Sequence, residues 1–568
     1  MVESYYRYFA WHFDVAPREE LQPIFDQVYA TSRIGVPHQT SRTRYDPQQL
    51  ALLFIILAMG SRHTLEHDTD DNVGADYLAL SKACLAKGDF MSHNTIAGVQ
   101  ALHIMAHYYL ETDESRSGDS AWPLWGLSMR LIEAMGLHRD GERWKLPSHE
   151  VERRRRVFWE CHTADIFQAN CFSRPNSIYP EYLDTEMPAE RHELHNVSKN
   201  EKGYHTLKFE LAQLSAQILD IAMRPQTPDY SRVSALHEDF SNLQRSIPYS
   251  LRCRAMLQAM PSMYPDSADA CQESPEPSKE HLTNAFQQHF LAMNISEMVL
   301  YLHRPFFARM IHEQPHDPTQ SPYGLSYLAV VERCNVIIQV VTSINKLYPA
   351  VSARHWVLWY QSFNSAVCMG ALALHHPSDP LAGFAISQLD ATIELYLKVV
   401  QTYSSAKKVQ NLRWLMQLRL RATQAMDRIS RDVSQVETSP DELDVVDVEL
   451  LGWRTRLVER AGGHTLATTI SPSSSGLRVT PSPNTAVNQT ISRAVQQLFT
   501  DDLPVDDHLD GASMNVESTA DFLLSQICEP MFAPSVPDLA GNEFVNAMSG
   551  TAPGFTQSTD WDDYDFFQ

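Results

Sequence analysis

The first 435 residues of the sequence predict an all-α fold, and the remaining residues predict a disordered chain with an acidic end. Apolar residues recur at helical spacing through most of the first part. No run of strict two-residue alternation is closed by a hairpin turn, so no β-sheet is expected. The last 68 of the 568 residues hold 14 Asp and Glu and no Lys or Arg, which accounts for most of the net charge of −23.

The expected helices follow from apolar stripes and from residues that begin or end a helix. Ser92 is expected to cap one helix, and Asp119 or Ser120 opens a second. The second ends at Gly136, because glycine adopts the left-handed conformation that closes a last turn. A third begins at Ser148, where acidic residues complement the helix dipole. Further helices are expected over 205–223, 280–303, 324–347, 353–376, 383–404 and 408–431.

Three regions are predicted from changes in composition. Residues 1–435 form the helical region, with Pro-rich loops near 261–280 and 313–322. Residues 436–500 form a mostly disordered Ser/Thr/Pro-rich linker, which cannot bury enough apolar surface to offset its chain entropy. Residues 501–568 form an acidic tail that contains aromatic residues.

Charge, cysteine spacing and hydropathy exclude several classes of protein. The net charge is negative even without the tail, which argues against a chain that binds nucleic acid along its length. The eight cysteines form no C-x-x-C pair, so neither a zinc site nor a disulfide framework is expected from them. The longest apolar run, at 50–59, is half the length of about 20 residues that a membrane span needs, so no membrane partner is expected.

One string matches a catalytic metal motif. His63, Glu66 and His67 fit the inverted zinc-protease pattern H-x-x-E-H, in which two histidines bind zinc and the Glu acts as base. This pattern gives the alternative function, an all-α metal-dependent enzyme. The interpretation we favour is a frayed helix end that enters a solvated loop, with no catalytic residue, no bound metal and no cofactor in the chain.

The dense basic run at 153–156 has a structural interpretation. Four consecutive helical residues point around the whole circumference, so they cannot form one phosphate-binding face. We expect some of these arginines to pair with acids within the fold and others to be solvated. A nuclear import signal is the alternative.

The end of the tail has the composition of an activation segment. Trp561, Tyr564, Phe566 and Phe567 stand among four Asp residues. Like charges keep such a segment extended, so its aromatic groups are available to a partner's groove. We expect these residues to bind the transcription co-activator machinery. A tail that only keeps the protein soluble would not need the aromatic residues.

Several strings together resemble the fungal-specific transcription factor domain, the middle homology region of zinc-cluster regulators. They lie at 125–140, 150–160, 173–188 and 302–307, and the similarity covers roughly residues 1–430. Ser173 stands where that family usually has Gly. The family-motif positions are Gly136, Leu137, His138, Arg139, Arg154, Arg155, Arg156, Phe158, Trp159, Arg174, Pro175, Asp184 and Pro188.

The resemblance implies an all-α regulatory domain of a nuclear transcription factor and no enzymatic activity. Members of the family typically carry an N-terminal Zn₂Cys₆ cluster that binds DNA as a dimer. No six-cysteine cluster precedes the matching strings here. We therefore expect zinc only in a longer form that carries the cluster, and contact with DNA only indirectly or through such a module. The expected partners are co-activators and a homo- or heterodimer partner.

Overall fold

The structure is a computed structural model, and it describes residues 1–33, 45–66, 73–112, 120–190, 201–223, 229–313, 317–403 and 405–432. These residues contain seventeen α-helices, four short 3₁₀ helices and no strand, which confirms the all-α prediction. The predicted linker at 436–500 and the acidic tail at 501–568 lie outside the described residues. The boundary at 435 stays a prediction.

The helices of the described residues have the following bounds, in chain order. The α-helices are α1 (Val2–Tyr8), α2 (Arg18–Arg33), α3 (Pro47–His63), α4 (Val73–Lys87), α5 (Ile96–Glu111), α6 (Ala121–Ala134), α7 (Ser148–Cys171), α8 (Tyr204–Met223), α9 (Tyr230–Arg245), α10 (Arg254–Gln258), α11 (Ser267–Gln272), α12 (Leu282–Glu313), α13 (Gly324–Leu347), α14 (Pro349–Ser352), α15 (Trp356–His375), α16 (Ala382–Thr402) and α17 (Ala406–Asp432). The 3₁₀ helices are η1 (Gly141–Trp144), η2 (Pro180–Tyr182), η3 (Tyr249–Leu251) and η4 (Pro318–Gln320).

The N-terminal helices pack around α5. Fourteen of its sixteen residues are buried, because α3, α4 and α6 cover it on different sides. The hydrophobic core of these N-terminal helices includes the fully buried side chains of Tyr5, Trp125 and Phe158. Thr95 caps α5, since its hydroxyl accepts from the Gly98 N–H at 3.2 Å. The prediction that Ser92 is the cap is therefore wrong.

The C-terminal helices form a second group. The 32-residue α12 packs along α13, and α15 packs against α13, α16 and α17. Among the described helices, α13 is long and apolar enough to cross a membrane by length and composition alone, and 67% of its most apolar stretch is buried. A buried core helix of this length meets the same criterion. Helix α13 packs against α12 and α15, as a core helix does.

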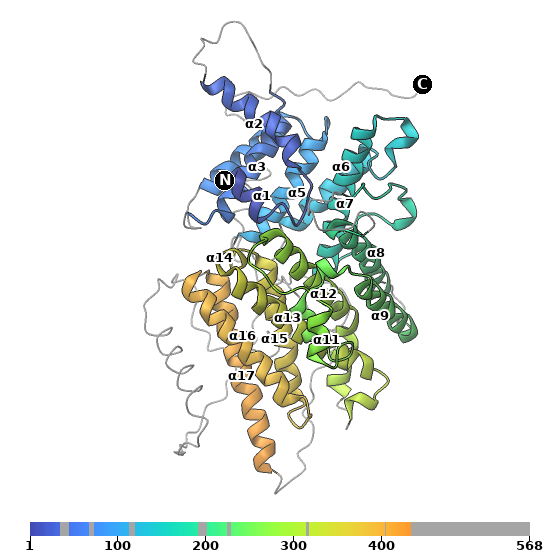
Figure 1. Ribbon diagram of the computed structural model, residues 1–568, viewed down its shortest axis with the longest axis vertical. Coiled ribbons are helices and arrows are strands. Elements are labelled where there is room, and N and C mark those ends of the chain that lie inside the picture. The colour runs from blue at the N-terminus through green and yellow to red at the C-terminus, as the bar shows by residue number, and fades with distance from the viewer. Residues whose placement is uncertain are drawn as a thin grey trace, which may run out of the picture. The chain divides into compact units, whose positions relative to one another are not determined.

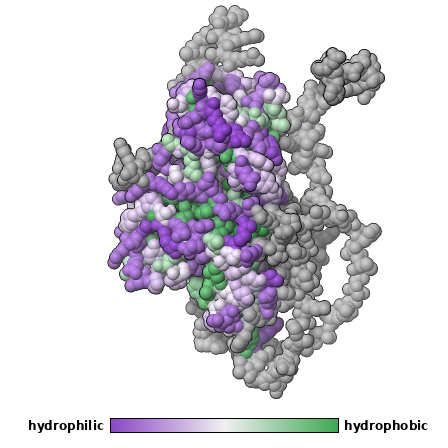
Figure 2. Space-filling model, turned by 90° about the vertical axis from the view of Figure 1, so that its right-hand side faces the viewer, coloured by the Kyte–Doolittle hydropathy of each residue, from purple (hydrophilic) through white to green (hydrophobic). Residues whose placement is uncertain are grey.

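The two groups of helices touch along several elements. Figure 1 shows α1, α3 and α5 at one end, α15 to α17 at the other, and α8 and α9 along one side. Helices α8 and α9 contact α12, and Trp356 and Tyr360 of α15 pack against the N-terminal core. On the side where Figure 1 places α6 to α9, Figure 2 shows a mostly hydrophilic surface with apolar side chains gathered at mid-height.

The nine expected helices are all present, as α5 to α8, α12, α13 and α15 to α17. Gly136 follows the end of α6 with a φ of +69°, and the Leu137 N–H bonds to the Ile132 carbonyl, as the sequence predicts. Helix α12 extends ten residues beyond its expected end and contains Pro305. The short α11 lies inside the loop expected at 261–280, where the Asp266 side chain caps it.

Candidate ligand pocket and the motif residues beside it

The Asp140 carboxylate joins three of the motif strings. It accepts hydrogen bonds from Arg155 Nε at 2.7 Å and Arg155 Nη2 at 3.0 Å. The backbone N–H groups of Glu142 and Glu186 donate to it at 3.0 Å. The Asp140 N–H in turn donates to Asp184 at 2.9 Å. The strings at 125–140, 150–160 and 173–188 therefore meet at one buried ion pair.

The pKa values of this cluster follow from its charges. The hydrogen bonds from the Arg155 guanidinium lower the pKa of Asp140 to about 2. The same contact raises the pKa of Arg155. For Asp184, burial raises the pKa, but the Asp140 N–H and the charges of Arg143 and Arg139 outweigh burial, so the pKa falls. Both carboxylates are stabilised in their charged form.

The other arginines of the run at 153–156 also have partners. Arg153 reaches Glu20 at 3.0 Å, Arg154 donates to the Met135 carbonyl at 2.7 Å, and Arg156 lies 3.6 Å from Asp14. The expected pairing within the fold is confirmed, and it extends to all four arginines, including those expected to be solvated. An import signal needs an extended, accessible segment, and this run is helical with Arg155 only 7% exposed.

Further residues of the motif strings are held by contacts within the fold. Trp159 Nε1 donates to the Glu186 carbonyl at 2.9 Å, and Phe158 is fully buried. The Arg174 guanidinium lies over the Trp122 ring, 5.4 Å from its centroid. Ser173 has a φ of +51°, so it adopts the left-handed conformation that the family's Gly would take.

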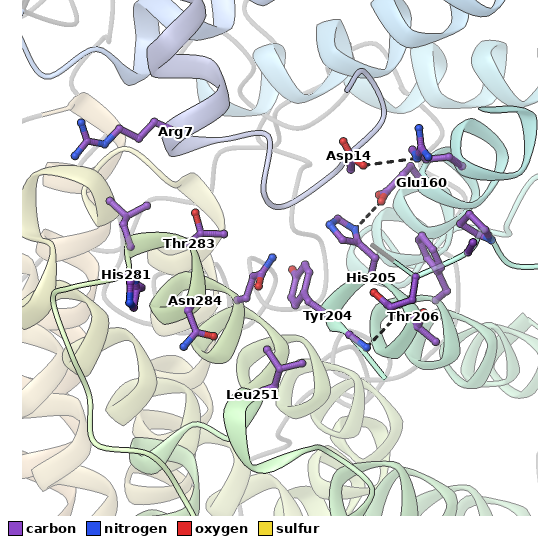
Figure 3. Close-up of a pocket in the computed structure, with 18 of the residues that line it drawn as sticks. Arg7, Asp14, Glu160, Tyr204, His205, Thr206, Leu251, His281, Thr283 and Asn284 are labelled. Carbon is purple, nitrogen blue, oxygen red and sulfur yellow. Dashed lines mark hydrogen bonds and ion pairs between the residues drawn. The ribbon is translucent and has the colours of Figure 1, made fainter. Parts of the chain in front are cut away.

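Next to the motif cluster lies a cavity of about 490 Å³. Its walls come from α1, α7, the start of α8 and the start of α12, which lie far apart in the sequence. Figure 3 shows Tyr204 between Glu160 and His205 on one side and Thr283 and Asn284 on the other. The motif residues Pro188 and Arg156 belong to the wall, so the motif cluster helps to form the cavity.

A buried ion pair lies under one wall of the cavity. The fully buried Lys208 Nζ donates to Glu160 Oε2 at 2.6 Å and to the His12 carbonyl at 2.7 Å. The other Glu160 oxygen lies 2.7 Å from His205 Nδ1. Burial raises the pKa of Glu160, but the Lys208 and His205 charges outweigh burial and lower it to about 2. Burial lowers the pKa of Lys208.

The cavity offers charges of both signs to a ligand. Arg7 and Lys279 are exposed cations on its wall, while Glu190 and Glu280 supply carboxylates. Asn284 adds a side-chain amide. A cavity of this volume lies within the usual range for small-molecule sites. The arrangement therefore suits a small polar molecule that carries groups of both signs.

The predicted metal triad does not assemble as its motif requires. Helix α3 ends at His63, so Glu66 does not continue its helical face. His63 is 1% exposed, whereas Glu66 is exposed, and His67 lies outside the described residues. The predicted helix end is confirmed, since α3 ends at His63 and Glu66 is exposed. His63 itself is not solvated, because its ring packs against Phe9 and His355.

Of the two other predicted sets, the structure describes one. The string at 302–307 lies within α12, where His303 bonds to Ser326 and His237 at 2.8 Å each. Trp561, Tyr564, Phe566 and Phe567 lie outside the described residues.

Comparison with known proteins matches the chain to fungal transcriptional regulators. Residues 2–289 match the fungal specific transcription factor domain, so the string at 302–307 lies beyond the match. An uncharacterized transcriptional regulatory protein of Schizosaccharomyces pombe is 24% identical over 396 residues, which cover 66% of this chain and 46% of the relative. The TY1 enhancer activator of Saccharomyces cerevisiae is 30% identical over 173 residues, covering 28% of this chain and 22% of the relative.

A third relative is the pyriculol/pyriculariol biosynthesis cluster transcription factor 1 of Pyricularia oryzae. It is 30% identical over 107 residues, which cover 19% of this chain and 14% of that protein. The chain spans about half the length, or less, of these three relatives.

Proposed function

Because the chain belongs to the fungal specific transcription factor domain family, we propose that it regulates DNA-templated transcription. The observation that carries the proposal is the family match over residues 2–289. The motif strings within the match also converge in space on Asp140 and Arg155. The family and the matched relatives are transcription regulators, a class distinct from the metal-dependent enzyme that the string at 63–67 suggests.

In this proposal the helical part is the regulatory domain. The 490 Å³ cavity supports that role, because it lies where the N-terminal helices meet the start of α12. A ligand held there touches α1, α7, α8 and α12 together. It can therefore shift the equilibrium between two packings of these helices, provided that it binds one packing more tightly.

The acidic tail is the proposed activation segment. Trp561, Tyr564, Phe566 and Phe567 supply aromatic anchors, and anchors of this kind dominate the binding energy of interfaces. The carboxylates between them speed the encounter with basic surfaces of co-activators. A homo- or heterodimer partner and a DNA-binding module bring the chain to its promoters, and the protein acts in the nucleus.

Chromatin occupancy in a fungal cell tests this proposal. The full chain, tagged and expressed in the fungus that encodes it, should be concentrated in the nucleus and enriched at a set of promoters. Deletion of its gene should change transcription of those genes. A tagged chain that stays in the cytoplasm, or that is enriched nowhere, contradicts the proposal.

The role of the cavity is tested separately. Asn284→Leu removes a polar group of the cavity at similar volume, and it should alter the transcription of target genes while promoter occupancy is kept. Asn242→Leu, at an exposed position of α9, is the matched control and should leave both unchanged. Identical transcription in the Asn284 variant and the wild type would exclude the cavity from regulation.

A further inference from the structure

Three metal-ligating side chains from distant parts of the chain meet beside the N-terminal core. His63 ends α3, Glu111 ends α5, and His355 directly precedes α15. Their donor atoms all lie within 4.8 Å of one another. His63 and His355 are 1% and 2% exposed, and the Glu111 side chain is 5% exposed.

The two imidazole rings have nitrogen atoms that lack hydrogen bonds. Among the described residues, neither nitrogen of His63 has a partner, and Nε2 of His355 has none. A hydrogen bond to the Tyr8 backbone involves the His355 ring. Buried polar atoms almost always have a partner in folded proteins. A bound ion that accepted the lone pairs of both rings would supply the missing interaction.

The backbone around each ligand is held by hydrogen bonds between the segments. The Arg62 guanidinium donates to the Glu111 carbonyl at 2.8 Å, and Arg354 donates to the Thr64 carbonyl at 3.0 Å. The Trp356 N–H donates to Glu111 Oε2 at 3.0 Å. Neighbours of all three ligands therefore take part in these cross-links, which hold the ligands in place before any ion arrives.

We propose that His63, Glu111 and His355 bind a zinc ion. Two imidazoles and one carboxylate are a known zinc ligand set, which leaves a fourth position for water or another donor. Neighbouring ligands of tetrahedral zinc lie about 3.4 Å apart, given bonds of about 2.0–2.1 Å, so small side-chain movements close the site.

The surroundings select the kind of metal. The guanidinium groups of Arg62 and Arg354 lie beside the site and oppose any cation. Only a metal that bonds strongly to imidazole overcomes this repulsion, which favours zinc over magnesium or calcium. The ion links α3 and α5 of the family-matched region to α15, which lies beyond residue 289. The site does not depend on the proposed function in transcription.

Metal binding by the purified full chain tests the proposal. After treatment with a chelator, the wild type is dialysed against Zn²⁺ and desalted, and its metal content is measured by mass spectrometry. We expect one tightly held zinc per chain, a rise in melting temperature with Zn²⁺, and no rise with Mg²⁺, because a ligand stabilises the state that binds it. Co²⁺ should give the visible absorption of a tetrahedral site.

The variants locate the ion. Glu111→Gln keeps the shape and an acceptor for the Trp356 N–H but loses the charge, and it should bind zinc at least 10-fold more weakly. His63→Gln and His355→Gln should do the same. His103→Gln is the matched control, because His103 is buried with two unpartnered nitrogens yet lies outside the triad.

Three outcomes would overturn the assignment: a wild type that retains no zinc, equal zinc affinity in Glu111→Gln and wild type, or an equal loss in the His103 control. If the histidine variants fail to fold, circular dichroism will show this, and Glu111→Gln decides the question alone.

Discussion

At the scale of single residues, Asp140 is the carboxylate on which the family motifs depend. It accepts two hydrogen bonds from Arg155 and two from backbone N–H groups, and its side chain is only 8% exposed. Removing one partner of such a buried pair leaves the other charge uncompensated, which is strongly destabilising. The role of Asp140 is therefore to hold the segment at 184–188 against α7.

The pKa of Asp140 gives a pH dependence with a defined sign. Its folded pKa is about 2, below the ordinary value of 3.8, so the folded state binds fewer protons in this range. The stabilisation is complete above about pH 4 and is lost as the pH falls towards 2. We expect Asp140→Asn to unfold more easily than the wild type at pH 6, and the difference to shrink by about 2 kcal/mol towards pH 2.

Urea unfolding between pH 6 and the acid limit of the folded state measures this difference. Asp239→Asn removes an exposed carboxylate of α9 and serves as the control. A difference between wild type and Asp140→Asn that stays constant across the whole pH range would show that Asp140 does not carry the predicted charge interaction.

The sequence predicted some of these residue roles and missed others. Local spacing predicts that some of the arginines at 153–156 pair with acids and that others are solvated, because four consecutive helical positions cannot share one face. It does not predict which acid Arg155 binds, since Asp140 reaches it only after the chain turns at Gly136. His63 shows the same limit: its true neighbours, Glu111 and His355, are set by packing among three elements and leave no pattern in the sequence.

At the scale of helices, the ends of α6 and α7 use the same left-handed turn with different residues. Gly136 has a φ of +69°, and a Cβ there would have open space, with only Trp144 nearby at 3.8 Å. Ser173 has a φ of +51° after α7, and the Arg174 N–H closes the turn on the Ala169 carbonyl. At both positions a side chain costs backbone strain, because the residue is held in the left-handed region. At Gly136 this strain is the whole cost, since an added Cβ would meet no close atom.

Two substitutions with opposite expected signs test this comparison. Gly136→Val should lower the free energy of unfolding by about 1–2 kcal/mol, because a β-branched residue is strained in the left-handed region. Ser173→Gly should raise it by about 0.5–1 kcal/mol, since relief of strain exceeds the entropy that glycine adds to the unfolded chain. Chemical unfolding measures the free energy of unfolding of both variants. Changes of the same sign would contradict the explanation that both positions are strained by a side chain in the left-handed region.

Helix prediction succeeded where an apolar stripe was long and its ends were marked. Helix α13 matches its predicted range of 324–347, and Pro349 follows two residues after its end. Helix α9 was missed, although Val233, Leu236, Phe240 and Leu243 form a buried stripe at helical spacing. Its polar composition hid that stripe. Helix α12 passes Pro305, which sequence rules treat as a stop. Buried side chains continue on both sides of it, from Leu302 to Phe307 and Met310.

At the scale of the whole molecule, the acidic charge is concentrated at the end of the chain. The last 68 residues carry 14 of the 69 acidic side chains and no Lys or Arg, while the first 500 residues have a net charge of −9. The arginines at 153–156 are paired within the helical part, and the tail combines acids with aromatic residues. The proposed function, a regulatory body joined to an activation segment, accords with this division.

The same charge predicts weak contact with DNA. With a net charge of −23, the chain has too little basic surface to release counterions from phosphate. The purified 568-residue chain should therefore bind duplex DNA no better than an unrelated acidic protein in a fluorescence anisotropy titration. Sequence-selective binding at sub-micromolar concentration would contradict this expectation and would require a basic face that the charge balance does not suggest.

The central claim is that this chain regulates transcription and that its acidic tail activates it. The most direct measurement tethers the full chain to a reporter promoter through an unrelated DNA-binding domain and compares it with the variant in which Trp561, Phe566 and Phe567 are replaced by Ala. The account predicts strong reporter output from the parent chain and loss of most of it in the triple variant, at equal protein levels. A parent chain that leaves the reporter silent, or a triple variant that activates as well as its parent, would contradict it.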